Sequence, residues 1–341
     1  MPDTPPPTLR QIAEKAGVDR STVSLALRND PRIKAETCKH IQELAAQMGY
    51  RANPIVAQLM TQLREGQTSH FHSNLGMIDF GMAPDTPHAE LLEGTQKYAY
   101  SLGYGLDVFH AREYTPGRLE KILLSRGIRG VIINSLWGNS RLPDGYLSVW
   151  PKFSCCVIGA HTTNPEMNFV GDDNYATAMT AVEELRRRGF TRIGLAMHRL
   201  INLQTDFRFV AGFLAGNLTH TPIENPPVLL FEPEQKQKFL EWFEHHNPQV
   251  VISSQQEIYD WLQEAGYRVP EQVSLVHLDV YFCHQTWAGM LQQRPHWGAA
   301  AVNTVLAQLQ RRELGAPQVP KAVFVESRWQ DGPTLGTPRK I

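Results

Sequence analysis

Hydrophobic positions at the start of the chain recur at the spacing of a helix rather than of a strand. Apolar residues three and four positions apart lie on one face of a helix, so three such segments predict a small module of three helices. The segments are 9–16, 23–27 and 41–48. A fourth short pattern, 55–63, precedes a polar stretch without periodicity, which indicates a short helix followed by a linker.

From Leu75 onward the pattern changes to short β-rich apolar runs separated by amphipathic stretches. Nine runs can be counted: LGMIDF, YGLDVFH, RGVIINS, FSCCVIG, RIGLAM, PVLLFE, QVVISS, VSLVHLD and KAVFVE. Four of the stretches between them are long enough for helices: 88–102, 175–188, 235–246 and 258–265. Several of these are closed by a glycine that suits a helix end, at Gly103, Gly189 and Gly266. Strands that alternate with helices predict an α/β fold with parallel sheets.

Nine strands exceed one common five- or six-stranded sheet, so we divide this region into two lobes, each a doubly wound parallel sheet. The first boundary is placed where proline and polar residues cluster, between 161 and 168. The predicted domains are a head, 1–52; a hinge helix and linker, 53–73; a first lobe, 74–161 with 291–325; and a second lobe and tail, 162–290 with 326–341. Ligands in such folds bind beyond the carboxyl ends of the strands, so the cleft between the lobes is the expected site.

Composition fits a folded protein and excludes several classes. Hydrophobic residues make up 42% of the 341 residues and charged residues 20%, which excludes global disorder. No apolar run approaches the roughly 18 residues of a membrane span, and the first seven residues do not resemble a signal peptide. The four cysteines form no C-x-x-C pattern. We therefore expect a cytoplasmic protein that neither enters a membrane nor holds a metal.

The net charge of −1 hides an asymmetry along the chain. Residues 1–65 carry nine Lys and Arg against seven Asp and Glu, whereas the remainder carries 24 against 27. The basic excess therefore lies entirely at the N-terminus, which is a weak indication of nucleic-acid binding.

Residues 9–24, LRQIAEKAGVDRSTVS, have the spacing of a helix-turn-helix. Ala13 is small where two helices approach closely, and Gly17 can take the left-handed conformation of the turn. Asp19 is placed to cap the second helix with its carboxylate. Arg20 and Ser21 follow at the exposed start of the helix that would enter the major groove. The alternative interpretation is an ordinary two-helix corner.

Extended along the chain, this motif carries a resemblance. TLRQIAEKAGVDRSTVSLALRNDPRI, followed by GYRANPIVAQL, resembles the DNA-binding head and hinge of the lactose-repressor (LacI/GalR) family of bacterial transcription regulators. The resemblance continues more weakly over nearly the whole chain, for example in FVGDDNYA and EAGYRVPEQVSLV. It implies an all-α helix-turn-helix head and an α/β core similar to periplasmic sugar-binding proteins, which senses an effector.

The resemblance also implies which residues of the head contact DNA. Base contacts would come from Arg20 and Ser21, and phosphate contacts from Asp19, Thr22, Ser24 and Asn29. Leu25 departs from the family, which usually has a guanine-reading arginine at this position. Leucine offers only apolar contact, for example to a thymine methyl, unless Arg28 supplies the missing guanidinium.

In the hinge, 53–63 resembles the family segment that folds as a helix on operator DNA. The resemblance implies that Asn53, Val56 and Leu59 contact DNA, with Leu59 as the wedge that kinks the duplex from the minor groove. Pro54 suits the first helical position. Without the resemblance, the same apolar stripe would be interpreted as packing on the core.

For the core, the resemblance implies an effector site. Asp279 matches an aspartate that accepts hydrogen bonds from ligand hydroxyls or polar ring atoms; alternatively it caps the following loop. Gln255 stands where the family commonly has asparagine, which keeps an amide. In the family, an arginine that binds the effector stands at the position of Phe209. Arg208 lies one residue before that position, so the alternative is that Arg208 is an ordinary surface arginine. Three further residues could stack on a sugar or base: Trp137, His161 and Trp287. Each of them alone is more often a packing residue.

The competing functions are an α/β enzyme and a solute-binding protein without regulatory output. No G-x-G-x-x-G follows a strand, and neither G-x-x-x-x-G-K-[ST] nor H-E-x-x-H occurs. A solute-binding protein would need an exported N-terminus instead of a helix-turn-helix. The tail lacks a leucine heptad, so we expect a homodimer rather than a coiled-coil tetramer. We predict a repressor that binds double-stranded operator DNA and is controlled by a small sugar-like or nucleobase-like effector. We expect neither a cofactor nor catalytic residues.

Overall fold

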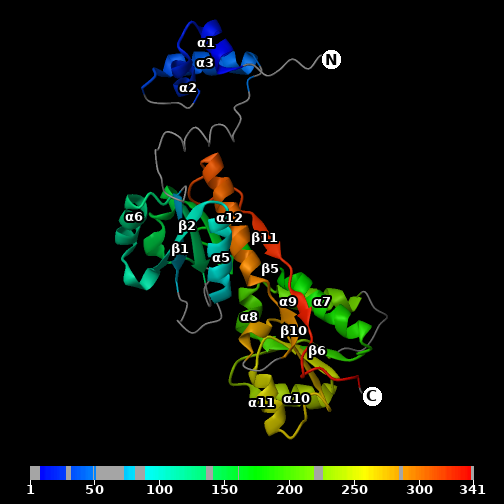
Figure 1. The fold of residues 1–341 in the computed structure, drawn as a ribbon. Helices are drawn as coiled ribbons and strands as arrows, with labels where there is room; N and C mark the ends of the chain where they lie inside the picture. The colour runs from blue at the N-terminus through cyan, green and yellow to red at the C-terminus, as the bar shows by residue number, and fades with distance from the viewer. Residues whose placement is uncertain are drawn as a thin grey trace, which may run out of the picture. The chain divides into compact units, whose positions relative to one another are not determined.

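The computed structural model describes residues 8–27, 32–48, 50, 73–80, 89–135, 141–159, 161–218, 226–283 and 287–338 (Figure 1). The chain divides into two compact units, Met1–Ser69 and His70–Ile341. Each unit has its own hydrophobic core.

The described residues of the first unit form three helices around one core. They are α1 (Leu9–Ala16), α2 (Arg20–Ala26) and α3 (Ala35–Gln47), which confirms the helical spacing of the apolar residues. Ile12, Val23 and Ile41 are at most 1% exposed and join the three helices. Gly17 ends α1 with a φ of 65°, the left-handed conformation expected of this turn residue.

The starts of α1 and α2 are capped differently. The Thr8 hydroxyl accepts a hydrogen bond from the Gln11 amide, and the Gln11 side chain accepts one from the Thr8 amide, which forms a capping box. Asp19 precedes α2 as predicted, but its side chain makes no capping hydrogen bond. The predicted cap is therefore wrong. Asp19 is exposed, so water can solvate its carboxylate and the first amides of α2 in place of the capping bond.

The second unit contains two lobes, each built on one sheet. The sheet of the first lobe has the order β11-β5-β4-β3-β1-β2, with all neighbours parallel. Its strands are β1 (Ser73–Asp79), β2 (Tyr104–His110), β3 (Gly130–Ser135), β4 (Ser154–Gly159), β5 (Asn168–Asp172) and β11 (Ala322–Val325). Helix α6 (Pro116–Ser125) packs on one face, and α5 (Ala89–Ser101) and α12 (Arg294–Arg311) cover the other. Its short 3-10 helices are η1 (Ala111–Glu113), η2 (Asp144–Tyr146) and η3 (Trp150–Lys152).

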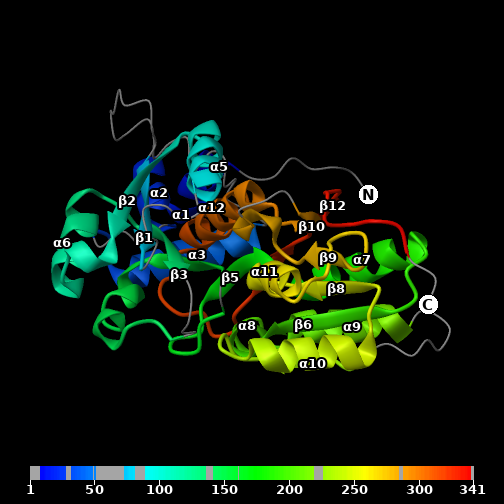
Figure 2. The same ribbon diagram turned by 90° about the horizontal axis from the view of Figure 1, so that it is seen from below.

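The sheet of the second lobe has the order β12-β10-β9-β8-β6-β7 and is parallel except for the pairing of β10 with β12. Figure 2 shows β10, β9, β8 and β6 one below the other, in the order in which they pair. The strands are β6 (Ile193–His198), β7 (Leu229–Phe231), β8 (Val250–Ser253), β9 (Ser274–His277), β10 (Ala288–Leu291) and β12 (Arg328–Gln330). One face carries α7 (Asn174–Arg187) and α9 (Arg208–Leu218), and the other carries α10 (Lys236–His246) and α11 (Glu257–Glu264). The remaining short helices are α8 (Arg199–Gln204) and η4 (Val280–Phe282).

The chain passes between the two sheets at three places. β5 leads into α7, β10 leads into α12, and β11 leads into β12. The first passage differs from the expected boundary between 161 and 162, because Asn168–Asp172 is a strand of the first sheet. Phe169 and Val170 pair with both β4 and β11, so this segment fills a central position instead of opening the second lobe. The polar segment before it is a loop of the first lobe.

All nine β-rich runs form strands, which confirms the pattern from which an α/β fold was predicted. Periodicity missed the three short strands β5, β10 and β12. The four predicted helices correspond to α5, α7, α10 and α11, and the three closing glycines have φ angles of 80°, 91° and 87°. α6, α8, α9 and α12 were not singled out from the sequence. In the part of the chain that the structure describes, no helix is long and apolar enough to cross a bilayer.

Candidate functional site

Helix α2 turns one face into the core of the head and the opposite face outward. Val23 and Ala26 are fully buried. Since successive residues are about 100° apart around a helix, Ser21 and Leu25 lie on the opposite side. Leu25 is only partly buried and is not one of the residues of the head's hydrophobic core. An apolar side chain that the core does not use makes this face suited to contact with another molecule.

The other predicted DNA contacts surround this face where the structure describes them. Asp19 and Arg20 are exposed, whereas Thr22 and Ser24 are partly buried. The start of α2 thus carries a cation, a carboxylate and hydroxyls on adjoining positions. The predicted contacts that lie outside the described residues are Arg28, Asn29, Asn53, Val56 and Leu59.

In the second unit, Asp279 lies two residues after the end of β9, at the carboxyl end of the sheet, and is 6% exposed. Its carboxylate accepts hydrogen bonds from the Tyr281 amide at 3.3 Å and from the Arg294 guanidinium at 2.6 Å. Burial raises the pKa of Asp279 to about 6, and the charge of Arg294 opposes this shift. Asp279 therefore caps η4, as the alternative interpretation held, and it is also half of a buried ion pair.

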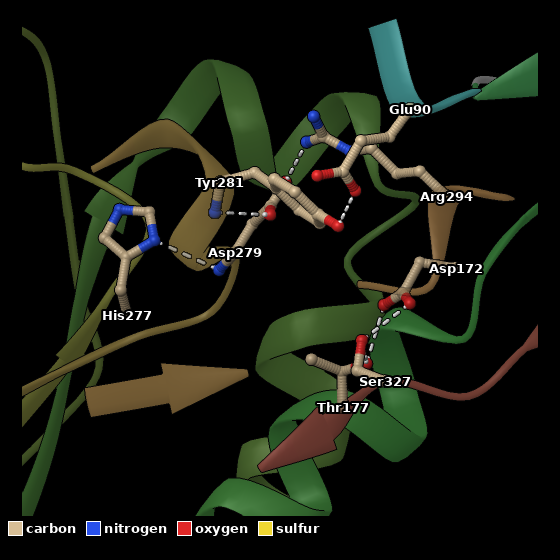
Figure 3. A network of polar contacts seen from close by, with 8 residues as sticks. All are labelled: Glu90, Asp172, Thr177, His277, Asp279, Tyr281, Arg294 and Ser327. Carbon is tan, nitrogen blue, oxygen red and sulfur yellow. Dashed lines mark hydrogen bonds and ion pairs between the residues drawn. The ribbon is translucent and has the colours of Figure 1, made fainter. Parts of the chain in front are cut away.

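Arg294 and Tyr281 extend this contact from the second lobe to the first (Figure 3). Arg294 begins α12 and is 2% exposed, and its guanidinium lies 4.6 Å from the centre of the Tyr281 ring. The Tyr281 hydroxyl donates a hydrogen bond to the carboxylate of Glu90, in the first turn of α5. Glu90 belongs to the first lobe and Tyr281 to the second, so a chain of contacts leads from Asp279 to α5.

A second buried carboxylate, Asp172, lies where β5 passes into α7 (Figure 3). It accepts hydrogen bonds from the hydroxyls of Thr177 at 2.6 Å and Ser327 at 2.7 Å. None of the ion pairs between described residues involves it. Burial, assisted by the nearby charge of Asp279, raises the pKa of Asp172 to about 7, and the hydrogen bonds from Thr177 and Ser327 oppose this shift. Because Ser327 lies between β11 and β12, Asp172 connects the first and third passages between the lobes.

Three polar residues at the end of the first sheet lie in register on adjacent strands. Asp79 pairs with His110 on β2 and with Asn134 on β3. The Asp79 carboxylate lies 3.2 Å from His110 Nδ1. Asn134 is fully buried, yet neither its Oδ1 nor its Nδ2 has a hydrogen-bond partner in the described part of the protein. A buried amide without partners costs free energy, which marks this strand end as a position for a ligand group.

The corresponding strand ends of the second lobe also hold buried polar groups, and His277 Nε2 and Trp287 Nε1 have no hydrogen-bond partner among the described residues. The side-chain oxygen of Gln255 accepts a hydrogen bond from the His198 amide at 2.9 Å. His277 Nδ1 accepts one from the Asp279 amide at 3.0 Å, and burial lowers the pKa of His277 to about 4, so the ring is neutral at pH 7. Trp287 is 1% exposed and packs against His277 in a core cluster. Trp287 packs in the core of the second lobe, as the alternative interpretation held, and its stacking on a ligand stays a prediction.

The last group of candidates meets around Phe324 of β11. The guanidinium of Arg208 lies 4.3 Å from the centre of the Phe324 ring, so this arginine of the second lobe reaches the first. Phe209 is 4% exposed and belongs to the core of the second lobe. His161 packs on Phe169 at 4.2 Å and faces Phe324 at 6.5 Å between ring centres, and burial lowers its pKa. Trp137 lies outside the described residues.

The structure thus brings Asp279 together with residues that the sequence analysis did not single out. These are Glu90, Asp172, Tyr281 and Arg294. A search for polar residues at or next to the last position of a strand would have found Asp172, and also Asp79 and Asn134 at the end of the first sheet. Arg294 and Tyr281 carry no such signal, because their partners come from distant parts of the chain.

Comparisons with known proteins agree with both units. The family model described as bacterial regulatory proteins, lacI family, matches residues 8–53. The regulator PtxS of Pseudomonas putida is 24% identical over 80% of this chain and 79% of its own, and the repressor PurR of Haemophilus influenzae is 21% identical over 91% and 94%. The lac repressor dimer, solved with operator and the anti-inducer ONPF, superimposes with a TM-score of 0.55 at 19% identity, over 97% of this chain and 100% of that one. The fold is therefore that of these repressors.

Proposed function

We propose, from the premise that residues 8–53 belong to the lacI family of bacterial regulatory proteins, that this protein is a transcription regulator that binds operator DNA. It works as a homodimer in the bacterial cytoplasm, as a repressor, under the control of a small polar effector. The observation that carries the proposal is a lacI-family head on the same chain as a two-lobed core with the fold of the lac repressor. The similar proteins are regulators, and catalysis forms no part of the proposal.

In the head, α2 is the recognition helix. Its outer face presents Ser21 and Leu25 to the major groove, with Arg20 beside them at the helix start. This placement is supported by the exposure of Arg20 and Ser21 and by the absence of Leu25 from the head's core. Phosphate contacts come from Asp19, Thr22, Ser24 and Asn29, with Arg28 as a further contact. Asn53, Val56 and Leu59 enter the minor groove.

In the core, the effector binds between the carboxyl ends of the two sheets. Asp279 and Gln255 contribute from the second lobe and Asn134 from the first, which supplies both acceptors and donors to a ligand rich in hydroxyl or amide groups. The support from the structure is the partnerless amide of Asn134 and the buried, Arg294-paired carboxylate of Asp279. Arg208 and His161 flank this region around Phe324.

The DNA-binding part is tested by selection of genomic fragments with the full-length protein. Wild type is expected to enrich a pseudo-palindrome with half-sites about one helical turn apart. Arg20→Ala is expected to lose roughly 100-fold or more in affinity for that fragment while it keeps weak binding to random DNA. Lys39→Ala, an exposed cation on α3, serves as the charge-matched control. Equal enrichment by wild type and Arg20→Ala would contradict the proposal.

The effector part is tested by thermal shift against sugars, sugar phosphates and nucleobases. A ligand at about 100 times its Kd stabilises the folded state by about 2.7 kcal/mol. Because the amide of Asn134 has no hydrogen-bond partner among the described residues, Asn134→Ala is expected to leave the unliganded transition within a few degrees of wild type. The same variant is expected to reduce the affinity for the hit at least ten-fold. An unchanged affinity would remove Asn134 from the site.

A further inference from the structure

The contact between the two lobes at Glu90 is continuous with the buried carboxylate of Asp279 (Figure 3). The Tyr281 hydroxyl donates a hydrogen bond to Glu90 of α5, and the Tyr281 ring lies 4.6 Å from the Arg294 guanidinium. The same guanidinium donates a hydrogen bond to Asp279 at 2.6 Å. We call these three contacts, from Asp279 through Arg294 and Tyr281 to Glu90, the relay.

We infer that Arg294 and Tyr281 are positioning residues that couple the state of Asp279 to the contact between the lobes. The inference rests on the proposed effector site and adds a route by which that site acts on the rest of the molecule. A ligand that binds the Asp279 carboxylate changes the strength of the ion pair between Asp279 and Arg294. Arg294 then changes the position of the Tyr281 ring, and the hydrogen bond to Glu90 follows.

The burial of Arg294 makes its position dependent on Asp279. A guanidinium that is 2% exposed is costly to bury without a partner, and its ion pair with Asp279 supplies the opposite charge. The Asp279 carboxylate also accepts the Tyr281 amide hydrogen, so Asp279 caps the start of η4. A change at the carboxylate therefore reaches Tyr281 through its backbone as well as through Arg294.

The other end of the relay has the properties of a contact that forms and breaks. Glu90 is exposed and Tyr281 is only partly buried, whereas the cores of the two lobes lie elsewhere. An exposed hydrogen bond is cheap to break compared with core packing, so it can shift the balance between two lobe arrangements without threatening the fold. Burial and the Glu90 carboxylate raise the pKa of Tyr281 to about 12, so the hydroxyl stays a donor at physiological pH.

The effect of the relay is measured as the distance between the two lobes. Spin labels on Lys121→Cys in α6 and Glu241→Cys in α10 report it in the full-length protein, diluted with unlabelled protein so that each dimer holds one labelled protomer. Tyr281→Phe and Glu90→Ala are each expected to shift the ratio of short to long distances about ten-fold toward long ones. The matched control is Tyr98→Phe, which removes a tyrosine hydrogen bond to Asn303 within the first lobe and is expected to change nothing. Wild-type distances in both Tyr281→Phe and Glu90→Ala would overturn the inference.

Coupling to Asp279 is tested by combining variants. Asp279→Asn and Arg294→Lys should each lengthen the distance on their own but add nothing in the Tyr281→Phe background, because all three act through one contact. Additive effects would overturn the relay, and if one of the two variants does not fold, the other gives the answer. The experiment needs neither DNA nor effector, so a failure of the relay is distinguishable from a failure of the proposed function.

Discussion

Two buried polar residues, Asn134 and Asp172, lower the stability of the folded lobes. Among the described residues, the side-chain amide of Asn134 has no hydrogen-bond partner, and Asp172 accepts hydrogen bonds from two hydroxyls but takes part in no ion pair. Burying such groups costs free energy, which reduces the stability that the hydrophobic cores of the two lobes provide. In the proposed site a ligand would supply hydrogen bonds to Asn134, whereas the cost at Asp172 depends on its protonation.

The raised pKa of Asp172 predicts a dependence of stability on pH. In the unfolded chain this carboxyl titrates near 3.8, and folding raises its pKa to about 7. A raised pKa contributes stability that is complete below about pH 4 and is lost as the pH rises through about 7. Asp172→Asn keeps groups that bond to Thr177 and Ser327 without the charge. We expect it to be more stable than wild type at pH 8 by on the order of 2 kcal/mol, and equal to it near pH 4.

Urea denaturation at pH 4, 6 and 8 measures this difference. Asp260→Asn, on the exposed side of α11, is the control for the general effect of one charge. A difference between Asp172→Asn and wild type that stays constant across the pH series would contradict the assignment.

At the scale of elements, the close pairing of α7 with α9 sets the shape of the second lobe. A Cβ atom at Gly212 of α9 would lie 2.1 Å from the carbonyl oxygen of Tyr175 in α7. The two helices approach so closely only because this position has no side chain. This contact also fixes the start of α9, from which Arg208 extends to Phe324.

Gly212→Ala is therefore expected to destabilise the second unit. The backbone must shift to admit the methyl group, at a cost of about 2 to 3 kcal/mol, which differential scanning calorimetry detects as a lower transition temperature. Gly117→Ala in α6 is the matched control, because a Cβ there meets nothing within 4 Å. Alanine also favours the helix, so the control is expected to be neutral or up to about 1 kcal/mol more stable. A neutral Gly212→Ala would mean that the two helices can separate at little cost.

For the whole molecule, the separation into two units predicts independent folding. The core of the head is Ile12, Ala13, Val23, Ala26, Cys38, Ile41 and Ala45, all within Met1–Ser69. The cores of the lobes lie entirely within His70–Ile341. Since no core is shared, loss of the first unit leaves the apolar contacts of the second intact.

A chain of residues 70–341 is thus expected to unfold in the same high-temperature transition as the full-length protein, within about 2 °C, and to bind any effector hit with unchanged affinity. It should bind no operator fragment at concentrations at which the full chain binds. Calorimetry and a mobility-shift assay measure the two properties. Operator binding by the truncated chain would place DNA recognition outside the head.

The sequence by itself determined the elements whose causes are local. Helical spacing and Gly17 predicted the three helices of the head, and the β-rich runs predicted nine strands, because periodicity and turn conformation depend on neighbouring residues. Asp279 became a candidate through the resemblance to the lactose-repressor family and not through a local pattern.

Tertiary structure decided what depends on distant partners. β5 was not recognised as a central strand of the first sheet, because its pairing with β11 joins segments about 150 residues apart. The packing of Trp287 in the core of the second lobe likewise depends on residues distant in the chain. Arg294 and Tyr281 gained their roles from Asp279 and Glu90, and no pattern along the chain records such a meeting. The fold follows largely from local preferences, whereas the chemistry at the junction of the lobes arises from contacts that only chain folding creates.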